Sequence, residues 1–152
     1  IVYNNKLMPN LILCLDFYFE GDMLEDDNAW LDEEKNEKID VKKCFRIWKF
    51  PNILIITLKR YHNGLRKIQN IVDFPLTDMD MSKYYCYSRK EPVLYDCIGV
   101  CNHSGSVEGG HYTSFVKKQD NKWYHYNDSV IQQISDSSVV SEKAYCLFYR
   151  KK

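Results

Sequence analysis

Apolar residues occur along the chain in short runs separated by polar turns, and many of them are β-branched or aromatic. This pattern predicts strands rather than long helices. The clearest strand is predicted at residues 53–58, a continuous apolar run typical of a central strand buried on both faces. Other runs predict strands at residues 44–48, 68–74, 95–101, 112–116, 122–126 and 144–149. One short helix is predicted at residues 11–19, with Asn10 as its N-cap.

The polar segments between these runs predict how the strands connect. Asn63-Gly64 is a two-residue hairpin signal, and residues 117–121 form a polar loop between two strands. Ser135 is expected to cap a single helical turn that ends near Glu142. Residues 21–43 are mostly charged with little periodicity, which predicts a solvated excursion. The whole pattern indicates an α+β fold dominated by an antiparallel sheet.

Charge and cysteine content narrow the function classes. The chain of 152 residues carries 21 basic and 21 acidic side chains, so net charge recruits neither nucleic acid nor a membrane. No apolar run reaches the roughly 18 residues that span a bilayer, and the N-terminus has no signal-peptide pattern. The six cysteines include no Cys-x-x-Cys pair, which favours reduced thiols in a cytoplasmic or nuclear protein. No cofactor is expected.

The candidate chemistry lies around His111. Two glycines, Gly109 and Gly110, precede this histidine and let the backbone approach a ligand closely. A hairpin centred on Gln119 would place His111 directly opposite Asn127, and a slip of one residue would place it opposite Asp128. We expect the histidine to deprotonate a thiol while Asn127 holds the ring in the useful tautomer.

Other residues of this region have more than one possible role. Asp128 either orients the histidine, positions water or an oxyanion, or is only a turn-forming carboxylate. His103 either lines the same cleft as His111 or is a loop histidine bonded to backbone. Cys101 is the least unfavourable nucleophile among the cysteines, but its position on a strand favours a buried, unreactive thiol. Neither of the other two histidines, His62 and His125, has the spacing of a metal site.

Four ordered motifs resemble the ubiquitin-specific protease family and together cover roughly residues 10–150. They are Trp48-Lys-Phe-Pro-Asn-Ile-Leu-Ile-Ile-Thr-Leu-Lys-Arg-Tyr61, Val72-Asp-Phe-Pro-Leu76, residues 95–105, and the histidine box. The box comprises Gly109-Gly-His-Tyr-Thr-Ser114, Trp123-Tyr-His-Tyr-Asn-Asp128 and the terminal Ala144-Tyr-Cys-Leu-Phe-Tyr149. The chain is similar to the C-terminal half of this family's papain-like catalytic domain.

The resemblance implies an antiparallel-sheet palm at about residues 48–152 and part of the fingers at about residues 10–47, with the thumb missing. It implies a cysteine-type deubiquitinase that cleaves after the C-terminal glycine of ubiquitin. The expected partners are ubiquitin, ubiquitinated proteins and the thumb part of the same domain, which carries the Cys box. His111 would be the general base and Asn127 the third triad member. The ubiquitin tail would contact Tyr112 along a channel narrow enough to select glycines, together with Gly109, Gly110 and His103.

The chain departs from the family pattern at two places. It holds no Gly-Asn-Thr-Cys-type box, so these residues alone are expected to be inactive. Where the fingers usually carry Cys-x-x-Cys zinc ligands, it reads Leu31-Asp-Glu-Glu-Lys-Asn-Glu-Lys38, so no metal is expected. One alternative function is a catalytically silent ubiquitin-binding module. A weaker one is another cysteine hydrolase that uses Cys101.

Overall fold

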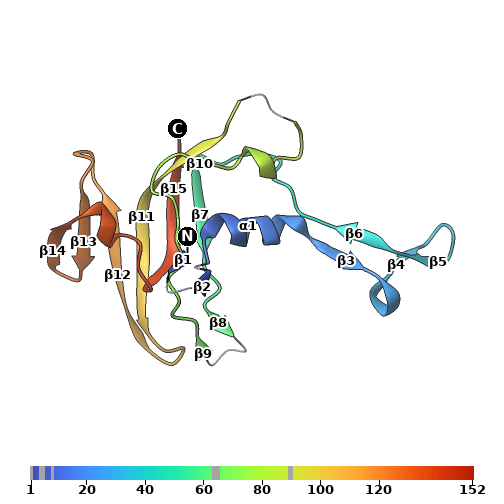
Figure 1. The fold of residues 1–152 in the computed structure, drawn as a ribbon, viewed down its shortest axis with the longest axis horizontal. Coiled ribbons are helices and arrows are strands. Elements are labelled where there is room, and N and C mark those ends of the chain that lie inside the picture. Colours follow the sequence, from blue (N-terminus) through green and yellow to red (C-terminus); the bar gives the residue numbers. More distant parts are fainter. Residues whose placement is uncertain (1, 4–5, 8, 63–65, 89–90) are drawn as a thin grey trace.

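The structure is a computed structural model that describes the chain except residues 1, 4–5, 8, 63–65 and 89–90 (Figure 1). Its single described α-helix, α1, spans Leu11–Glu20. The strands are β1 Val2–Tyr3, β2 Lys6–Leu7, β3 Asp22–Leu24, β4 Trp30–Asp32, β5 Glu37–Ile39, β6 Val41–Lys43, β7 Ile53–Thr57, β8 Tyr61–His62, β9 Arg66–Lys67, β10 Met79–Asp80, β11 Leu94–Gly105, β12 Gly110–Lys117, β13 Trp123–Asn127, β14 Val130–Ile134 and β15 Ala144–Lys151. Short 3₁₀ turns occur at Asp26–Asn28, Ser82–Tyr84 and Asp136–Ser138.

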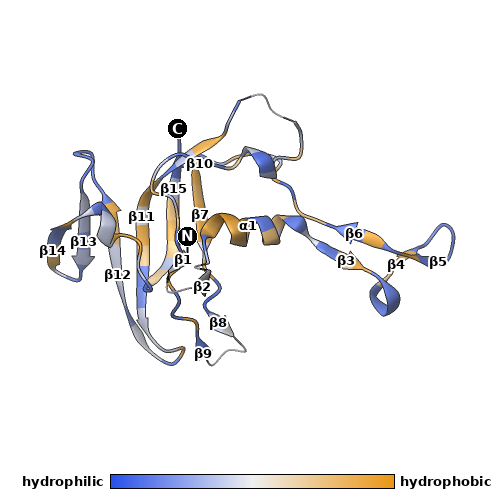
Figure 2. Cartoon of the chain, in the orientation of Figure 1, coloured by the Kyte–Doolittle hydropathy of each residue, from blue (hydrophilic) through white to orange (hydrophobic). Residues whose placement is uncertain are grey.

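A seven-stranded antiparallel sheet forms the body of the protein. Six strands follow the order β14-β13-β12-β11-β15-β7, and β10 pairs with β11. The long strand β11 is central, with β12 on one side and β15 on the other. Figure 2 shows hydrophobic residues concentrated along β7, β11 and the first half of α1. The predicted antiparallel α+β architecture is therefore confirmed.

The core lies on the face of the sheet that α1 and the connecting segments cover. Trp123, Tyr95 and Tyr149 are fully buried there. Along β11, burial alternates at Tyr95 and Cys97 and again at Val100 and Asn102, as in a half-buried strand, and a register shift between Cys97 and Gly99 separates the two stretches. The hydroxyl groups of the two tyrosines remain satisfied, because Tyr95 donates to the carbonyl of Pro51 and Tyr149 to that of Pro75.

Strand β7 differs from its prediction. Residues 53–57 form a strand, but this strand lies at the edge of the sheet rather than at its centre. Ile53 and Ile55 are 44% and 56% exposed, while Leu54 and Ile56 pack against the core. A continuous apolar run indicates that both faces of a strand avoid water, but it does not identify which polypeptide covers the second face. In this chain that face is open.

Several other local predictions can be compared with the structure. Two predicted strands are wrong: residues 44–48 and 68–74 contribute only isolated bridges, at Ile47 and Asp73. Strand β14 was not expected. The hairpin signal at Asn63-Gly64 lies outside the described residues, but β8 and β9 on either side of it pair in antiparallel register. The 3₁₀ turn after Ser135 is present without a side-chain cap.

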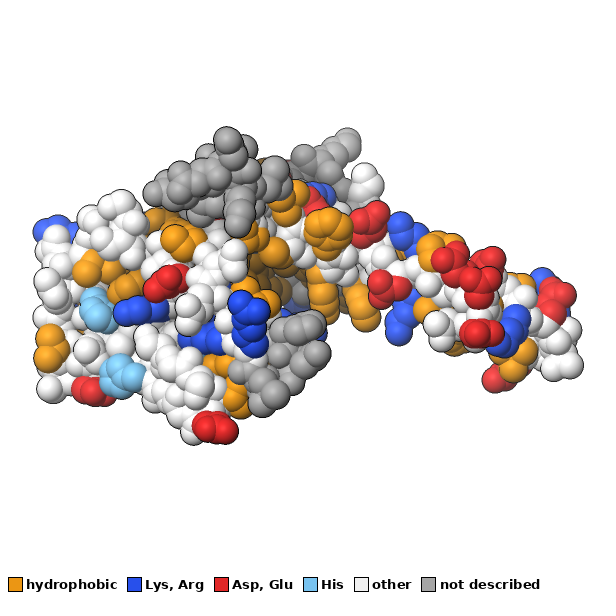
Figure 3. Space-filling model, turned by 60° about the horizontal axis from the view of Figure 1, so that its bottom comes forward, with side chains coloured by type: hydrophobic (Ala, Val, Ile, Leu, Met, Phe, Trp, Pro, Cys, Tyr) orange, Lys and Arg blue, Asp and Glu red, His pale blue; other side chains and the backbone are white. Residues whose placement is uncertain are grey.

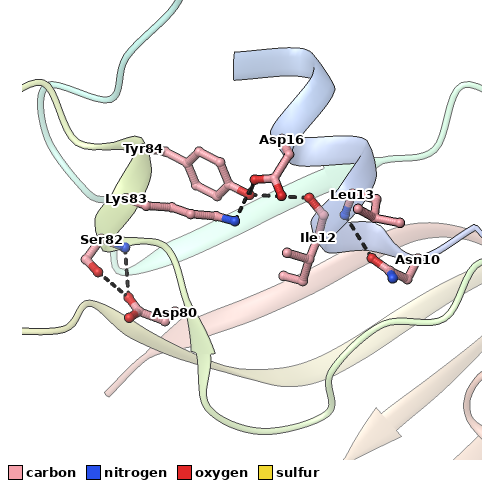
Figure 4. Close-up of polar contacts among 8 residues, drawn as sticks. All are labelled: Asn10, Ile12, Leu13, Asp16, Asp80, Ser82, Lys83 and Tyr84. Carbon is pink, nitrogen blue, oxygen red and sulfur yellow. Dashed lines mark hydrogen bonds and ion pairs between the residues drawn. The ribbon is translucent and has the colours of Figure 1, made fainter. Parts of the chain in front are cut away.

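The helix α1 begins and ends as the sequence predicts. The Asn10 side chain accepts a hydrogen bond from the backbone nitrogen of Leu13 at 2.8 Å. Gly21 ends the helix with a φ of 82°, a conformation that favours glycine. A polar network attaches the helix to the Ser82–Tyr84 turn (Figure 4). In it, the Asp16 carboxylate accepts from Tyr84 Oη at 2.8 Å and pairs with Lys83 Nζ at 2.5 Å.

Removing the Tyr84 hydroxyl should test this attachment. Tyr84 is buried, so Tyr84→Phe leaves its ring in place but removes the hydrogen bond to Asp16. We expect the free energy of unfolding to fall by about 1 kcal/mol, measured by urea unfolding of the protein. Tyr18→Phe is the matched control, because Tyr18 is 58% exposed. Equal stability of both variants would contradict a role for the hydrogen bond.

Residues 21–43 form a narrow arm that projects away from the sheet (Figure 1). Antiparallel pairing of β3 with β6 and of β4 with β5 builds this arm. Most of its side chains are exposed, as the charge-rich sequence predicts. The two strand pairs of the arm were not predicted, because a high content of charged residues does not reveal strand pairing. Within the described part of the chain, no helix is long and apolar enough to cross a membrane.

Candidate active site

The exposed end of β12 carries a histidine bonded to an asparagine. His111 Nε2 lies 2.6 Å from Asn127 Oδ1. An amide oxygen only accepts, so the hydrogen of a neutral imidazole lies on Nε2, and Nδ1 is free to accept a proton. The His111 side chain is 52% exposed. The pair can therefore receive a proton from a group that approaches Nδ1.

The predicted contact is present, but the predicted register is wrong. Lys117 pairs with Trp123 and Ser114 with Tyr126, so the hairpin is centred on Asp120 rather than on Gln119. The paired ladder ends at Ser114 and Tyr126. His111 therefore has no direct partner across the hairpin, and Asn127 reaches it diagonally. Diagonal neighbours in a sheet are about 7–8 Å apart at Cα, which two extended side chains can bridge.

Asp128 lies next to the pair but does not replace Asn127. Its Oδ2 is 3.9 Å from His111 Nε2, and its side chain is 81% exposed. Asp128 also has a φ of 49°, in the two-residue turn that joins Asn127 of β13 to Val130 of β14. Aspartate and asparagine tolerate this left-handed conformation better than most residues. The same Asn-Asp sequence thus closes the β13–β14 hairpin and supplies the histidine's partner.

The two glycines before His111 have different surroundings. A Cβ added to Gly110 would lie 2.3 Å from His103 Nε2 and 2.4 Å from the Ser104 carbonyl oxygen. A Cβ added to Gly109 would meet no atom within 4 Å. Gly110 is therefore required for packing within the protein. The space beside Gly109 remains open to a ligand.

His103 is buried rather than displayed on a loop. It is 4% exposed and pairs across the β11–β12 ladder with Tyr112, and their ring centroids are 4.6 Å apart. The rings of Tyr145 and Tyr61 lie at 5.8 and 6.3 Å. Burial, followed by the charge of Lys67, lowers the pKa of His103. Both effects disfavour the protonated form of the imidazole.

Tyr112, in contrast, presents its ring to solvent. It follows His111 on β12 and is 57% exposed. One of its neighbours is the buried His103, and the other is Tyr145 at 6.4 Å. The sequence did not identify Tyr61, Lys67 or Tyr145 as part of this cluster. They come from β8, β9 and β15. Strand β15 pairs with β11, whereas β8 and β9 form a separate hairpin whose side chains reach His103 by tertiary contact.

The six cysteines are free thiols. Cys101, the candidate nucleophile of the sequence analysis, does not lie opposite His111 in the pairing of β11 with β12. Cys101 pairs with Ser114 and Cys146, whereas His111 pairs with Ser104, three residues further along β11. Three residues of strand span about 10 Å. Burial, followed by neighbouring Cys146, raises the pKa of Cys101. Burial also raises the pKa of Cys97 to about 12. Neither environment favours a thiolate.

The tip of the arm does not fit a zinc site. The Asp32 carboxylate accepts from the backbone nitrogens of Glu34 and Lys35 at 3.1 and 3.2 Å and so closes the β4–β5 turn. Lys35 Nζ adds an ion pair with Asp32 at 3.7 Å. Structural zinc sites take four cysteine or histidine ligands. The positive charge of Lys35 would also repel a zinc ion. Among the described residues, no group of three metal-binding side chains is gathered.

A histidine bonded to an asparagine is the arrangement that papain-like cysteine hydrolases use, and in this chain the pair lies at the end of an antiparallel sheet. A family model described as ubiquitin carboxyl-terminal hydrolase matches residues 18–149. The chain therefore belongs to the ubiquitin carboxyl-terminal hydrolase family, as its motifs predict.

Curated relatives cover nearly the whole chain. It is 38% identical over 146 residues to ubiquitin carboxyl-terminal hydrolase 10 of Arabidopsis thaliana, an alignment that covers 93% of this chain and 16% of the relative. Its identity to ubiquitin carboxyl-terminal hydrolase 15 of Rattus norvegicus is 36% over 142 residues, 91% of this chain and 15% of the relative. The chain thus spans about one sixth of the length of these relatives.

Solved structures agree with the fold. The chain superposes with a TM-score of 0.83 and 34% identity on the SAGA DUB module Ubp8/Sgf11/Sus1/Sgf73 bound to monoubiquitin, covering 95% of this chain and 33% of that one. The same module bound to ubiquitin aldehyde gives a TM-score of 0.83 with 32% identity, covering 99% of this chain and 34% of that one. The body and arm are thus an α+β fragment of a ubiquitin-specific protease catalytic domain.

Proposed function

We propose that the chain supplies the general-base part of a deubiquitinase, which hydrolyses isopeptide or peptide bonds at the C-terminal glycine of ubiquitin. The hydrogen bond of 2.6 Å between His111 Nε2 and Asn127 Oδ1 carries this proposal. It leaves Nδ1 as the proton acceptor that a thiol nucleophile needs. Family membership and the ubiquitin-bound structural neighbours support the choice of substrate.

In each half of the reaction, His111 accepts one proton and returns it. Nδ1 takes the proton of the cysteine thiol, and the thiolate attacks the carbonyl carbon of the ubiquitin glycine. The carbon–nitrogen bond then breaks, and the leaving amine takes the proton back from His111. Water next attacks the resulting thioester while His111 again accepts a proton. The carbon–sulfur bond then breaks, and the leaving sulfur takes the proton back from His111, which restores the thiol. The glycine carboxyl group is released and loses its own proton to solvent.

The nucleophile, in this proposal, lies on the thumb part of the same catalytic domain. An apolar hollow of about 650 Å³ lies beside α1 and β7, lined in part by Leu11, Leu15 and Leu54. Figure 3 shows hydrophobic side chains gathered where the arm meets the body. The exposed face of β7, with Ile53 and Ile55, adds to this surface. Apolar surface of this kind is buried when a further part of the domain packs on it.

The ubiquitin tail would approach His111 past the open side of Gly109. The absence of any atom within 4 Å of a Cβ there supports this path. The exposed ring of Tyr112 would border it. Gly110 and His103 would form the layer beneath, since they pack on each other. A channel walled in this way favours a substrate that ends in glycines.

Turnover of ubiquitin carrying a C-terminal fluorophore tests the proposed function. Residues 1–152 alone should show no turnover, because the proposed nucleophile is not among them. The same chain extended through its natural upstream sequence should be active and should lose activity on alkylation of a thiol upstream. Turnover by residues 1–152 that Cys101→Ala abolishes would instead show another cysteine hydrolase. An extended protein that binds ubiquitin without turnover would be a silent binding module.

A further inference from the structure

Lys67 makes two polar contacts with His103. Its Nζ lies 3.0 Å from His103 Nδ1 and 2.6 Å from the His103 carbonyl oxygen. Lys67 belongs to β9 and His103 to β11, so these contacts join the small β8–β9 hairpin to the central strand. Burial, followed by the charge of Arg60, lowers the pKa of Lys67, and nearby Glu142 acts in the opposite direction. Lys67 is thus a partly desolvated cation aimed at one imidazole.

These contacts determine the tautomer of His103. An ammonium group donates and cannot accept, so Nδ1 must accept and the ring hydrogen lies on Nε2. The hydroxyl of Tyr61 lies 3.2 Å from the same Nδ1 and 3.3 Å from the Ser106 carbonyl oxygen. Because Nδ1 has one lone pair, which Lys67 occupies, the Tyr61 hydroxyl can donate to Ser106 instead.

The groups around the ring also oppose its protonation. The hydrogen bonds and ring contacts of the His103 imidazole involve Lys67 and three tyrosines, namely Tyr61, Tyr112 and Tyr145. None of these is a carboxylate that would stabilise an imidazolium. Burial first and the Lys67 charge second lower the pKa of His103. Without Lys67, this pKa should therefore rise.

The held ring contacts the chain on both sides of the candidate base. His103 Nε2 lies against the Cα of Gly110, as the 2.3 Å separation from an added Cβ shows. Its ring centroid lies 4.6 Å from that of Tyr112. Gly110 and Tyr112 directly precede and follow His111. The position of the His103 ring therefore affects where β12 presents His111.

We propose that Lys67 is a positioning residue, which holds His103 in its Nε2–H tautomer so that the ring supports the backbone around His111. This inference rests on the proposed function, because it assigns Lys67 an effect on the same hydrolysis. Lys67 acts through His103 and does not touch the substrate. A misplacement of about 1 Å at a catalytic group can cost about a hundredfold in rate, so a smaller shift should still be measurable.

Kinetics of the extended, active protein test the proposal. Lys67→Met should lower kcat for ubiquitin-fluorophore turnover about tenfold and change KM less than about twofold, because His111 shifts while no substrate contact is removed. Lys67→Arg keeps the charge and should recover most of the activity. Lys122→Met, at an exposed lysine of the β12–β13 turn, is the matched control and should behave as the parent protein.

A double-mutant cycle tests whether Lys67 acts through His103. Once His103→Ala has removed the ring, Lys67→Met should have no further effect on kcat. Additive losses would overturn the proposed route. A parent protein without ubiquitin turnover would refute the proposed function, whereas an active parent indifferent to Lys67→Met would refute only this inference.

Nuclear magnetic resonance of the histidine rings gives a readout that does not depend on activity. In the parent protein, the nitrogen shifts of His103 should report the Nε2–H tautomer. Lys67→Met should raise the pKa of His103, and Lys67→Arg should leave it near the parent value. If Lys67→Met unfolds the protein, the Lys67→Arg spectrum and the parent tautomer still decide the matter. An Nδ1–H tautomer in the folded parent would overturn the proposal.

Discussion

Replacing His111 with alanine should reduce ubiquitin-fluorophore turnover by about a thousandfold in the extended protein. The imidazole is the group that can take the thiol proton, because Asn127 occupies Nε2 and leaves Nδ1 free. The substitution removes an exposed side chain, so the fold should remain intact. Steady-state kinetics and a thermal unfolding curve measure the two effects separately.

Asn127 and a second histidine make this test specific. Asn127→Ala should lower turnover less than His111→Ala does, because it removes the partner that orients the ring and not the base itself. His125→Ala is the matched control. This histidine lies on the neighbouring strand β13 and packs against Phe115 at 5.1 Å. Full activity of the His111→Ala protein would remove the triad assignment.

The sequence predicted the elements that depend on local chemistry. Asn10 caps α1 because its short side chain reaches the free backbone nitrogen of Leu13. Short runs rich in apolar, β-branched and aromatic residues predicted β11, β12, β13 and β15, and the antiparallel sheet that they form is confirmed. The position of β7 could not be predicted in this way. Its apolar run predicts burial on both faces, whereas the face with Ile53 and Ile55 is exposed in this chain.

The contact between His111 and Asn127 was predictable from the sequence, and the strand register around it was not. Gly109-Gly110-His111 and Asn127 carried enough information to pair the histidine with the amide, and the contact of 2.6 Å confirms that pairing. The register differed because the loop from Lys118 to Lys122 lies one residue further along than expected. Hairpin register depends on turn geometry, which composition only restricts. The contact between Lys67 and His103 joins residues 36 positions apart, and no local pattern reports it.

The two glycines before His111 should respond very differently to alanine. A Cβ at position 110 would lie 2.3 Å from His103 Nε2 and 2.4 Å from the Ser104 carbonyl oxygen. The backbone atom cannot move aside without disturbing β11, which pairs with β12 at this point. We expect Gly110→Ala to lower the free energy of unfolding by about 1–3 kcal/mol, as overpacking usually does. Activity should fall with it, because His111 is the next residue.

Gly109→Ala is the matched control for folding and also a probe of the substrate path. No atom lies within 4 Å of an added Cβ there, so the free energy of unfolding should change by less than about 0.5 kcal/mol. If the ubiquitin tail passes over Gly109, the same methyl group should raise KM for ubiquitin-fluorophore. A small thiol-reactive fluorogenic probe should still label the nucleophilic cysteine. Unchanged KM with unchanged stability would exclude this tail path. Because Gly110→Ala affects packing and Gly109→Ala affects only open space, the pair separates the two reasons for which the chain carries adjacent glycines.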